Sequence, residues 1–234
     1  MQIAEIYQSL QGEGLLAGTP SVFVRTSGCN LRCHWCDTPF TSWQPTGDSM
    51  DVDDIVAAVD CLGRRHVVVT GGEPLLFGET LNLCRELRRR GHHVTIETAG
   101  TVLTAPPGVA PIADLMSISP KLASSGPPAD TPAGWAARHA SARRRDDVLE
   151  ALMSDGPWQL KFVIDSPDDL DEADGWISSL GGRVAGGAVF MMPQGVTADD
   201  LSRTTAWLSA ACESRGYRLA HRHHVDWFGH RRGT

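Results

Sequence analysis

The chain has 234 residues, of which 21 are lysine or arginine and 28 are aspartate or glutamate, so its formal net charge is −7. Hydrophobic residues make up 41% and charged residues 21%, which is typical of a soluble globular protein and not of a disordered chain. The acidic balance argues against sequence-independent nucleic-acid binding, which depends on basic residues that neutralise phosphates. No run of eighteen apolar residues is present, so no membrane-spanning helix is predicted. The N-terminus lacks the regions of a secretory signal, and we expect a cytoplasmic protein.

Apolar runs along the chain alternate between the patterns of strands and helices. Strands are predicted at 21–26, 66–70, 93–97, 115–119, 159–164 and 188–192. Helices are predicted at 52–62, 79–90, 136–153, 168–180 and 198–215, and an extended segment follows from Arg218. Asp51 is a suitable N-cap for the first helix, and Gly91 ends the second. The basic runs 88–90 and 143–145 are predicted to be solvated helix faces, and the Pro- and Gly-rich stretch 124–134 a loop.

This alternation predicts an α/β fold with a parallel sheet. About six βα units are too few for an eight-stranded barrel, and no Gly-x-Gly-x-x-Gly sequence supports a dinucleotide-binding fold. We therefore predict a single domain, residues 1–234, with a partial (β/α)6-type barrel. In such barrels the chemistry gathers at the carboxyl ends of the strands. Polar, glycine and cysteine residues follow the predicted strands at 26–29, 70–73, 97–98, 119–121 and 192–194.

Three of the six cysteines, Cys29, Cys33 and Cys36, lie on one short loop directly after the first predicted strand. Three thiolates at this spacing can converge on one metal centre, and a reducing compartment argues against a disulfide framework. Structural zinc needs four closed ligands, for which His34 is the nearest additional donor. An iron–sulfur cubane held by three thiolates leaves one iron open to a small molecule.

The Cys-x3-Cys-x2-Cys spacing resembles the signature of the radical S-adenosylmethionine superfamily. This resemblance implies a 4Fe-4S cluster on Cys29, Cys33 and Cys36, whose open iron binds the amino and carboxylate groups of S-adenosylmethionine. An electron from the cluster would then give a 5′-deoxyadenosyl radical. The sequence Gly71-Gly72-Glu73-Pro74 adds to the resemblance. Its glycines allow a ligand to approach the backbone, and its glutamate can accept a hydrogen bond from an ammonium.

Further motifs resemble, over almost the full length, the 7-carboxy-7-deazaguanine synthase family within that superfamily. These motifs lie at 6–14, 23–25, 28–30, 35–38, 97–98, 119–121, 159–162, 222–223 and 232–233. The resemblance implies conversion of 6-carboxy-5,6,7,8-tetrahydropterin to 7-carboxy-7-deazaguanine with loss of ammonia, on the route to 7-deazapurines such as queuosine. The adenosyl radical would abstract hydrogen from C6, and the contracted-ring radical would take it back. The resemblance also implies Mg²⁺ as a further cofactor, a flavodoxin-like or other electron donor, and a homodimer.

The resemblance also implies roles for single residues. Arg25 would bind the substrate carboxylate through its planar guanidinium, and Glu13 and His223 are the candidates for a later proton transfer. The substrate-binding residues implied in this way are Leu10, Gln11, Gly12, Glu13, Arg25, Thr70 and His223. The cofactor-binding residues are Trp35, Cys36, Asp37, Gly71, Gly72, Glu73, Ser119, Pro120, Lys121 and Gln194, and Thr38 would bind Mg²⁺. The segment 1–20 would form part of the substrate site, and the tail 218–234 would close it.

Two rival interpretations stay open at this level. A glycyl-radical activase would share the cysteines and the 71–74 motif but would act on a protein. It does not explain together the segment 11–13, Arg25 and the tail with His223. A zinc-binding interaction module would use the same cysteines without radical chemistry. Iron and sulfide in the purified protein would separate the module from the enzymes, and the nature of the substrate would separate the two enzymes.

Overall fold

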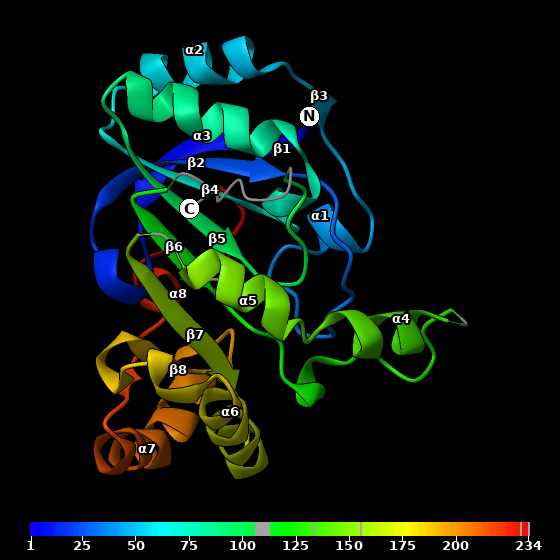
Figure 1. The fold of residues 1–234 in the computed structure, drawn as a ribbon, viewed down its shortest axis with the longest axis vertical. Helices are drawn as coiled ribbons and strands as arrows, with labels where there is room; N and C mark the ends of the chain where they lie inside the picture. The colour runs from blue at the N-terminus through cyan, green and yellow to red at the C-terminus, as the bar shows by residue number, and fades with distance from the viewer. Residues whose placement is uncertain (106–112, 133, 155, 230, 234) are drawn as a thin grey trace.

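One mixed sheet forms the centre of the protein. The computed structural model describes residues 1–105, 113–132, 134–154, 156–229 and 231–233. Across them the strands follow the order β3 (Asp48–Ser49), β1 (Gln2–Leu10), β2 (Pro20–Thr26), β4 (His66–Gly71), β5 (His93–Thr98), β6 (Leu115–Ile118), β7 (Trp158–Ile164), β8 (Val189–Pro193) and β9 (Arg218–Leu219) (Figure 1). Pairing is parallel from β2 to β9, whereas β1 pairs antiparallel with both β2 and β3.

Most of the helices lie between consecutive strands, and the last one follows the final strand. The helices are α1 (Pro39–Ser42), α2 (Val52–Leu62), α3 (Glu79–Arg89), α4 (Trp135–Ala142), α5 (Asp146–Met153), α6 (Pro167–Ser179), α7 (Ala198–Arg215) and α8 (His223–Phe228). Short 3-10 turns lie at η1 (Gly14–Leu16), η2 (Pro74–Leu76), η3 (Ala123–Ser125), η4 (Gly181–Arg183) and η5 (Gly186–Ala188). Among the described residues β3 and β9 end the sheet without pairing to each other. The predicted α/β class and partial barrel are therefore confirmed.

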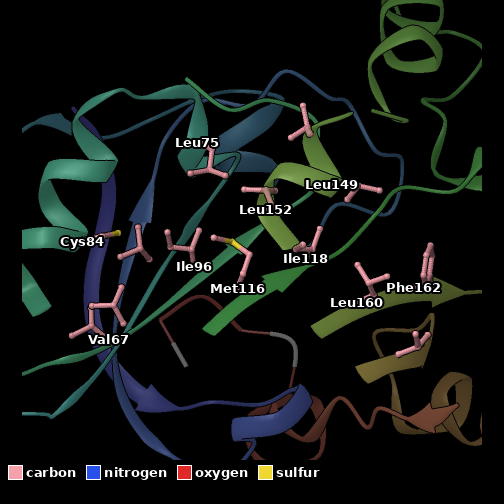
Figure 2. Close-up of a cluster of buried hydrophobic side chains, with 14 of the residues drawn as sticks. Val67, Leu75, Cys84, Ile96, Met116, Ile118, Leu149, Leu152, Leu160 and Phe162 are labelled. Atoms are coloured by element: carbon pink, nitrogen blue, oxygen red, sulfur yellow. The ribbon is translucent and has the colours of Figure 1, made fainter. Parts of the chain in front are cut away.

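The main hydrophobic core lies between the parallel strands and the helices that follow them (Figure 2). Val67, Ile96 and Ile118, from three adjacent strands, are fully buried. Leu149 and Leu152 of α5 belong to the same cluster. Burying each such side chain contributes about 1.5–3 kcal/mol of transfer free energy. This packing fixes the strands relative to one another, and with them the row of carboxyl ends at which the candidate site lies.

The predicted start of α2 and the predicted end of α3 are confirmed, and each has a capping residue. The Asp51 carboxylate accepts a hydrogen bond of 3.0 Å from the Asp54 backbone N–H at the start of α2. Gly91 follows α3 with φ +87°, a conformation that favours glycine. The run 88–90 ends α3 with exposed arginines that pair with acidic side chains, as predicted. None of the helices in the described parts of the chain is long and apolar enough to cross a membrane.

The strand β1 was not predicted from the sequence. Only Ile3 of its residues is buried, so the segment lacks the apolar run that marks the inner strands. It forms because it pairs with β2, where Tyr7 lies opposite Phe23 and the two rings stack 5.2 Å apart. Tertiary pairing therefore decides the conformation of this segment.

The predicted single helix 136–153 is wrong, since the structure has two helices, α4 and α5. The basic run 143–145 connects them, and Arg145 leaves the helical conformation with φ −137° and ψ 85°. Each arginine of the run pairs with a different acidic side chain. Arg143 also donates to the backbone carbonyl of Lys121 at 3.1 Å. The run is thus a connection between helices and not the helix face that we predicted.

The extended segment predicted from Arg218 is limited to the two residues of β9. The chain then turns into α8, and the backbone N–H of His223 donates to the carbonyl of Gly12 at 3.0 Å. This contact ties the tail to the segment after β1. The tail therefore lies beside the N-terminal segment at the carboxyl ends of the strands.

Candidate active site

A cavity of about 310 Å³ lies at the carboxyl ends of the parallel strands. Its walls come from β1, β2, the ends of β4 to β7, the cysteine loop (residues 27–38) and the tail. The predicted site residues that line it are Leu10, Gln11, Gly12, Glu13, Arg25, Cys29, Cys33, Trp35, Cys36, Asp37, Thr38, Thr70, Gly71, Gly72, Ser119 and Lys121. Those absent from the lining are Glu73, Pro120, Gln194 and His223.

The three motif cysteines share one wall of the cavity as free thiols. Cys33 is buried, and Cys29 and Cys36 pack partly buried against the same small apolar cluster. Burial raises the pKa of Cys29 to about 12 and that of Cys33 to about 11. Metal binding must therefore displace their protons. The number and grouping of these thiols fit a cluster held by three cysteines.

The ring of His34, the nearest candidate for a fourth zinc ligand, contacts the backbone of Gly126. It is exposed, and its Nδ1 lies 3.2 Å from the carbonyl oxygen of Gly126. Within the described parts of the chain, no three His, Cys, Asp or Glu side chains are placed to hold a single metal ion. A cubane does not need such a set, because each of its cysteines binds a different iron. The zinc alternative thus gains no fourth ligand from His34.

The glycine turn, Gly71-Gly72, packs directly on the start of the cysteine loop. The backbone N–H of Gly72 donates to the Thr26 carbonyl at 3.1 Å, and that of Glu73 donates to the Gly28 carbonyl at 2.9 Å. A Cβ on Gly72 would lie 2.3 Å from the Gly28 carbonyl oxygen, and Gly71 has φ +144°. Only glycine suits both positions, and the turn therefore presents bare backbone to the cavity.

Glu73 lies behind the cavity wall and not in it. Its carboxylate accepts hydrogen bonds from the Leu75 N–H at 3.1 Å, the Thr98 hydroxyl at 2.7 Å and the Ala99 N–H at 2.8 Å. Burial raises the pKa of Glu73, and these hydrogen bonds oppose the rise. Both oxygens are held by the protein's own donors. The side chain therefore fixes the glycine turn against the end of β5.

A charged wall, made of Glu13, Lys161 and Glu97, lines another side of the cavity. The Lys161 Nζ lies 2.9 Å from Glu13 Oε2 and 3.5 Å from Glu97 Oε1. Gln11 and Thr70 each donate to Glu97 at 3.1 Å. Burial opposes the charged forms, yet the neighbouring opposite charges hold the pKa of Glu13 well below its ordinary value and raise the pKa of Lys161. Glu13 and Lys161 therefore stay ionised at neutral pH.

Arg25 is held at the wall by residues of β1. Its Nε donates to Glu5 at 2.7 Å, and its Nη2 donates to the Tyr7 hydroxyl at 2.7 Å. Arg232 from the tail donates to the other Glu5 oxygen at 2.8 Å and stacks 4.1 Å from the Phe40 ring centre. Two guanidinium groups thus share one carboxylate, which leaves a net positive charge for an anionic ligand group.

The tail brings His224, and not His223, into the cavity lining. The His224 ring packs on Gly12, where an added Cβ would lie 2.5 Å from Nδ1, and Nδ1 is 3.8 Å from Glu13 Oε1. His223 stacks on the Trp227 ring with 5.1 Å between centroids. Adjacent residues at a helix start point about 100° apart, so a shift of one residue decides which histidine faces the cavity. Burial lowers the pKa of His224, which favours its neutral form.

Lysine and hydroxyl groups complete the lining near the cysteines. The Lys121 Nζ donates to the Ser119 hydroxyl at 2.7 Å and lies 5.6 Å from the centre of the Trp35 ring. Thr38 Oγ1 accepts a hydrogen bond of 3.1 Å from the Thr41 hydroxyl. An oxygen donor atom therefore lies beside the cysteines, at the position where the sequence predicts a magnesium ligand.

The stretch after the predicted loop 124–134 braces the cysteine loop. His139 of α4 is buried, and its Nδ1 accepts a hydrogen bond of 3.2 Å from the Arg32 backbone N–H. Its Nε2 lies 2.9 Å from the Ser125 hydroxyl, and the Arg32 guanidinium stacks 3.9 Å from the Trp135 ring centre. Burial lowers the pKa of His139 to about 4, so the ring is neutral and can accept this hydrogen bond.

Several lining residues were not selected from the sequence. They include Glu5, Tyr7, Glu97, His224 and Arg232, whereas Lys161 is expected from its strand position to pair with an acid at the barrel mouth, which the structure confirms. The signal that marks Lys161 was also available for Glu97, because both are charged residues within strands that are mostly buried. Of the residues that do not line the cavity, Pro120 is buried and the backbone of Gln194 continues the pairing with β7, donating to the Ile164 carbonyl at 2.8 Å.

Known proteins resemble this chain over nearly its whole length. The Radical SAM superfamily model matches residues 23–154. A 7-carboxy-7-deazaguanine synthase of Rhodopirellula baltica is 46% identical, over 99% of this chain and 88% of its own length. One of Halobacterium salinarum is also 46% identical, over 96% of this chain and 89% of its own length.

The crystal structure of QueE from Escherichia coli shares the fold. It superposes with a TM-score of 0.67 at 24% identity, covering 94% of this chain and 92% of that one. The structural similarity shows the fold, whereas the sequence matches show the family. At 46% identity over almost all of its residues, the chain belongs to the 7-carboxy-7-deazaguanine synthase family of the radical S-adenosylmethionine superfamily.

Proposed function

We propose that this protein converts 6-carboxy-5,6,7,8-tetrahydropterin to 7-carboxy-7-deazaguanine with loss of ammonia, a radical ring contraction in 7-deazapurine biosynthesis. The observation that carries this proposal is that three free thiols and the charged wall face one cavity. The thiols suit a cluster that starts radical chemistry, and the charged wall suits the polar edge of a pterin. Membership of the family supports the same activity.

The residues of the cysteine loop fit a 4Fe-4S cluster with S-adenosylmethionine. Cys29, Cys33 and Cys36 would hold the cluster, and together the two groups supply the one-electron chemistry that begins the reaction. The bare backbone of the glycine turn would bind the methionyl end of the cofactor. The Lys121 ammonium and the Ser119 hydroxyl offer polar contacts from the end of β6.

The charges of the lining suit a substrate with one carboxylate. The described lining has five cationic side chains, namely Arg25, Lys121, Lys161, Arg231 and Arg232, and four carboxylates, namely Glu5, Glu13, Asp37 and Glu97. Arg25 would bind the substrate carboxylate through its planar guanidinium. Gln11 and the ionised Glu13 would bind the amide-like edge of the pterin, since they offer both a donor and acceptors. Glu97 of β5 and Lys161 of β7 hold Gln11 and Glu13 in place, so the bound pterin would have a fixed orientation.

The proton transfer that completes the aromatic ring needs an available base. Glu13 is held ionised by Lys161 and Arg222, and the low pKa of its carboxylate makes it a weak proton acceptor. His224 faces the same cavity in a neutral form that burial favours. We therefore assign the orienting role to Glu13 and the proton-accepting role to His224.

The remaining parts of the proposal follow from the family resemblance. Thr38 would contribute a hydroxyl ligand to Mg²⁺, which keeps waters and substrate oxygens as its other ligands. A flavodoxin-like or other one-electron donor would reduce the cluster, and the protein would act as a cytoplasmic homodimer. Magnesium titration and sedimentation of the reconstituted protein would test the first and the last of these points.

An anaerobic assay tests the proposed activity. The protein is reconstituted with iron and sulfide and mixed with dithionite, S-adenosylmethionine, Mg²⁺ and 6-carboxytetrahydropterin. Mass spectrometry should then detect 7-carboxy-7-deazaguanine. Formation of 5′-deoxyadenosine without the deazaguanine would reject this substrate and favour a protein substrate.

Matched cysteine variants serve as controls for that assay. Cys33→Ala should lose iron and all product, because one thiol of the trio is gone. Cys61→Ala should retain both, because Cys61 is exposed on α2 and away from the cavity. Full iron content and product in Cys33→Ala would contradict the assignment of the cluster ligands.

A further inference from the structure

One buried cation near the site has so far been given no role beyond its charge beside Glu13. Arg222 lies between β9 and α8 and is 4% exposed. It is absent from the lining of the cavity. A buried guanidinium needs acceptors, because its charge is costly to remove from water. The identity of those acceptors therefore indicates what Arg222 does.

The Arg222 guanidinium contacts three segments that are distant in sequence. Its Nη2 donates to Asp37 Oδ2 at 2.5 Å, and its Nη1 donates to the Gly195 carbonyl at 2.6 Å. Its Nε lies 3.5 Å from Glu13 Oε1. Asp37 belongs to the cysteine loop, Glu13 to the substrate-side segment, and Gly195 directly follows Gln194. One side chain thus connects the cofactor side of the cavity with the substrate side.

The Arg222 guanidinium lies closer to Asp37 and Gly195 than to Glu13. The hydrogen bonds to Asp37 and Gly195 are short, even for a charged donor. The Arg222 Nε, however, is buried without a hydrogen bond, because 3.5 Å exceeds the usual N–H···O range. Glu13 is already fixed at its other oxygen by Lys161 at 2.9 Å. Arg222 is therefore anchored on the cysteine loop by a hydrogen bond, and it contacts Glu13 as an ion pair.

We propose that Arg222 is a positioning residue that fixes Asp37 and Glu13 relative to each other, and thereby the cofactor side of the cavity relative to the substrate side. This inference rests on the proposed function. A planar guanidinium can hold two acceptors by hydrogen bonds at fixed angles and keep a second carboxylate in ion-pair range, whereas the compact ammonium of lysine has no such fixed geometry. Without Arg222 the two sides lose their common anchor, and a misplacement of about 1 Å can cost on the order of 10²-fold in rate.

A double-mutant cycle tests the inference. The variants are Arg222→Met, Arg222→Lys, Asp37→Asn and the double variant Arg222→Met/Asp37→Asn. The readouts are kcat and KM for the pterin, the Kd of S-adenosylmethionine on the reconstituted protein by equilibrium dialysis, iron per chain, and Tm. Arg218→Met is the matched control, because Arg218 is an exposed arginine of the same tail that stacks 4.5 Å from the Phe190 ring centre, outside the cavity.

We expect Arg222→Met to lower kcat per bound cluster by about 10- to 100-fold, with partial recovery in Arg222→Lys. In the Asp37→Asn background the same change should cost at least about fivefold less, because contacting residues couple. The Kd of S-adenosylmethionine should show the same coupling. Arg218→Met should match the wild type in every readout.

Three results would overturn the inference. The first is a double variant whose loss of kcat equals the product of the two single-variant losses, because this means that Arg222 and Asp37 act independently. The second is wild-type kinetics in Arg222→Met, and the third is a lower Tm or iron content with unchanged kcat per cluster. If Arg222→Met does not fold, the cycle is built with Arg222→Lys. If the wild type cleaves S-adenosylmethionine without forming the deazaguanine, the proposed function fails, and coupling in the Kd alone decides the role of Arg222.

Discussion

The Lys161 Nζ lies 2.9 Å from the Glu13 carboxylate, although 148 residues separate the two in the chain. Glu13 follows β1 and Lys161 belongs to β7, and four strands lie between β1 and β7 in the sheet. The two residues can meet only because the sheet curves into a partial barrel. The pair therefore depends on the barrel shape, and it places the substrate-side segment across the mouth of the barrel.

Removing this lysine should affect both stability and substrate binding. Lys161→Met leaves the carboxylates of Glu13 and Glu97 facing each other without the cation between them. Breaking a buried charge pair in this way costs about 3–5 kcal/mol of unfolding free energy, an upper range for partly exposed partners. We expect a lower urea midpoint and a product rate reduced by at least about 10²-fold. Glu13→Gln combined with Lys161→Met should recover part of the stability, whereas a single variant as stable as the wild type would contradict this account.

The glycine turn should not tolerate a methyl group. In Gly72→Ala the new Cβ would lie 2.3 Å from the Gly28 carbonyl oxygen, and backbone cannot move aside cheaply. We expect the cysteine loop to shift and iron content after reconstitution to fall by more than half, an order-of-magnitude expectation from a displaced ligand loop. Gly175→Ala in α6 is the control, because no atom lies within 4 Å of its added Cβ. That variant should bind iron normally, and equal iron in both variants would argue against the packing role.

Glu73 offers a test of the buried hydrogen-bond network. In Glu73→Gln one acceptor oxygen becomes an NH2 group that faces the N–H of Leu75 or Ala99. Leaving such a buried donor unsatisfied costs about 1–3 kcal/mol. We expect a lower Tm and a higher KM for S-adenosylmethionine, since the turn loses its anchor on β5. Glu213→Gln, an exposed change on α7, should leave both values unchanged. Loss of cofactor binding at an unchanged Tm would instead indicate direct contact with the cofactor.

The sequence was most informative where the chemistry is contiguous. The cysteine spacing and the glycine turn are read from a few neighbouring residues, and the structure brings both to one cavity. The alternation of apolar strands and helices was sufficient for the fold class, because buried parallel strands are mostly apolar, as β4 and β7 are. The half-exposed strand β1 has no such run, so its pairing with β2 could not be predicted.

Partners that only the folded chain brings together could not be named from the sequence. The place of Lys161 within a strand predicts that it pairs with an acid at the barrel mouth, and the structure confirms this, but its partners Glu13 and Glu97 come from other segments. The choice between His223 and His224 depends on where α8 begins, and boundaries of short helices are poorly determined by sequence. Arg222 belongs to a recognised motif, but its three partners come from segments that only the folded chain brings together.

Protein stability should fall on moderate acidification because of His66. The ring is buried, with Nδ1 2.6 Å from the Ser21 hydroxyl and Nε2 2.8 Å from the Thr95 hydroxyl. Burial lowers the pKa of His66 to about 4, below the ordinary value of 6.5. Between these values the unfolded chain takes up a proton that the folded chain does not, so the free energy of unfolding falls as the pH falls and levels off below the folded pKa.

Urea midpoints measured across that pH window test this expectation. His66→Gln should show a flatter dependence on pH than the wild type, because one source of proton uptake on unfolding is gone. His221→Gln, a change at an exposed histidine of the tail, should keep the wild-type slope. Equal slopes in all three proteins would mean that His66 does not contribute to the pH dependence.

The most direct test of the central claim is the amount of 7-carboxy-7-deazaguanine formed per S-adenosylmethionine consumed. The measurement uses the reconstituted protein under anaerobic conditions, with both compounds quantified by mass spectrometry in one reaction. If the cavity holds cofactor and pterin together, hydrogen returns to the cofactor at the end of each cycle, and we expect many products per cofactor. Stoichiometric 5′-deoxyadenosine with no deazaguanine, from a protein with full iron content, would contradict the claim that this cavity carries out the ring contraction.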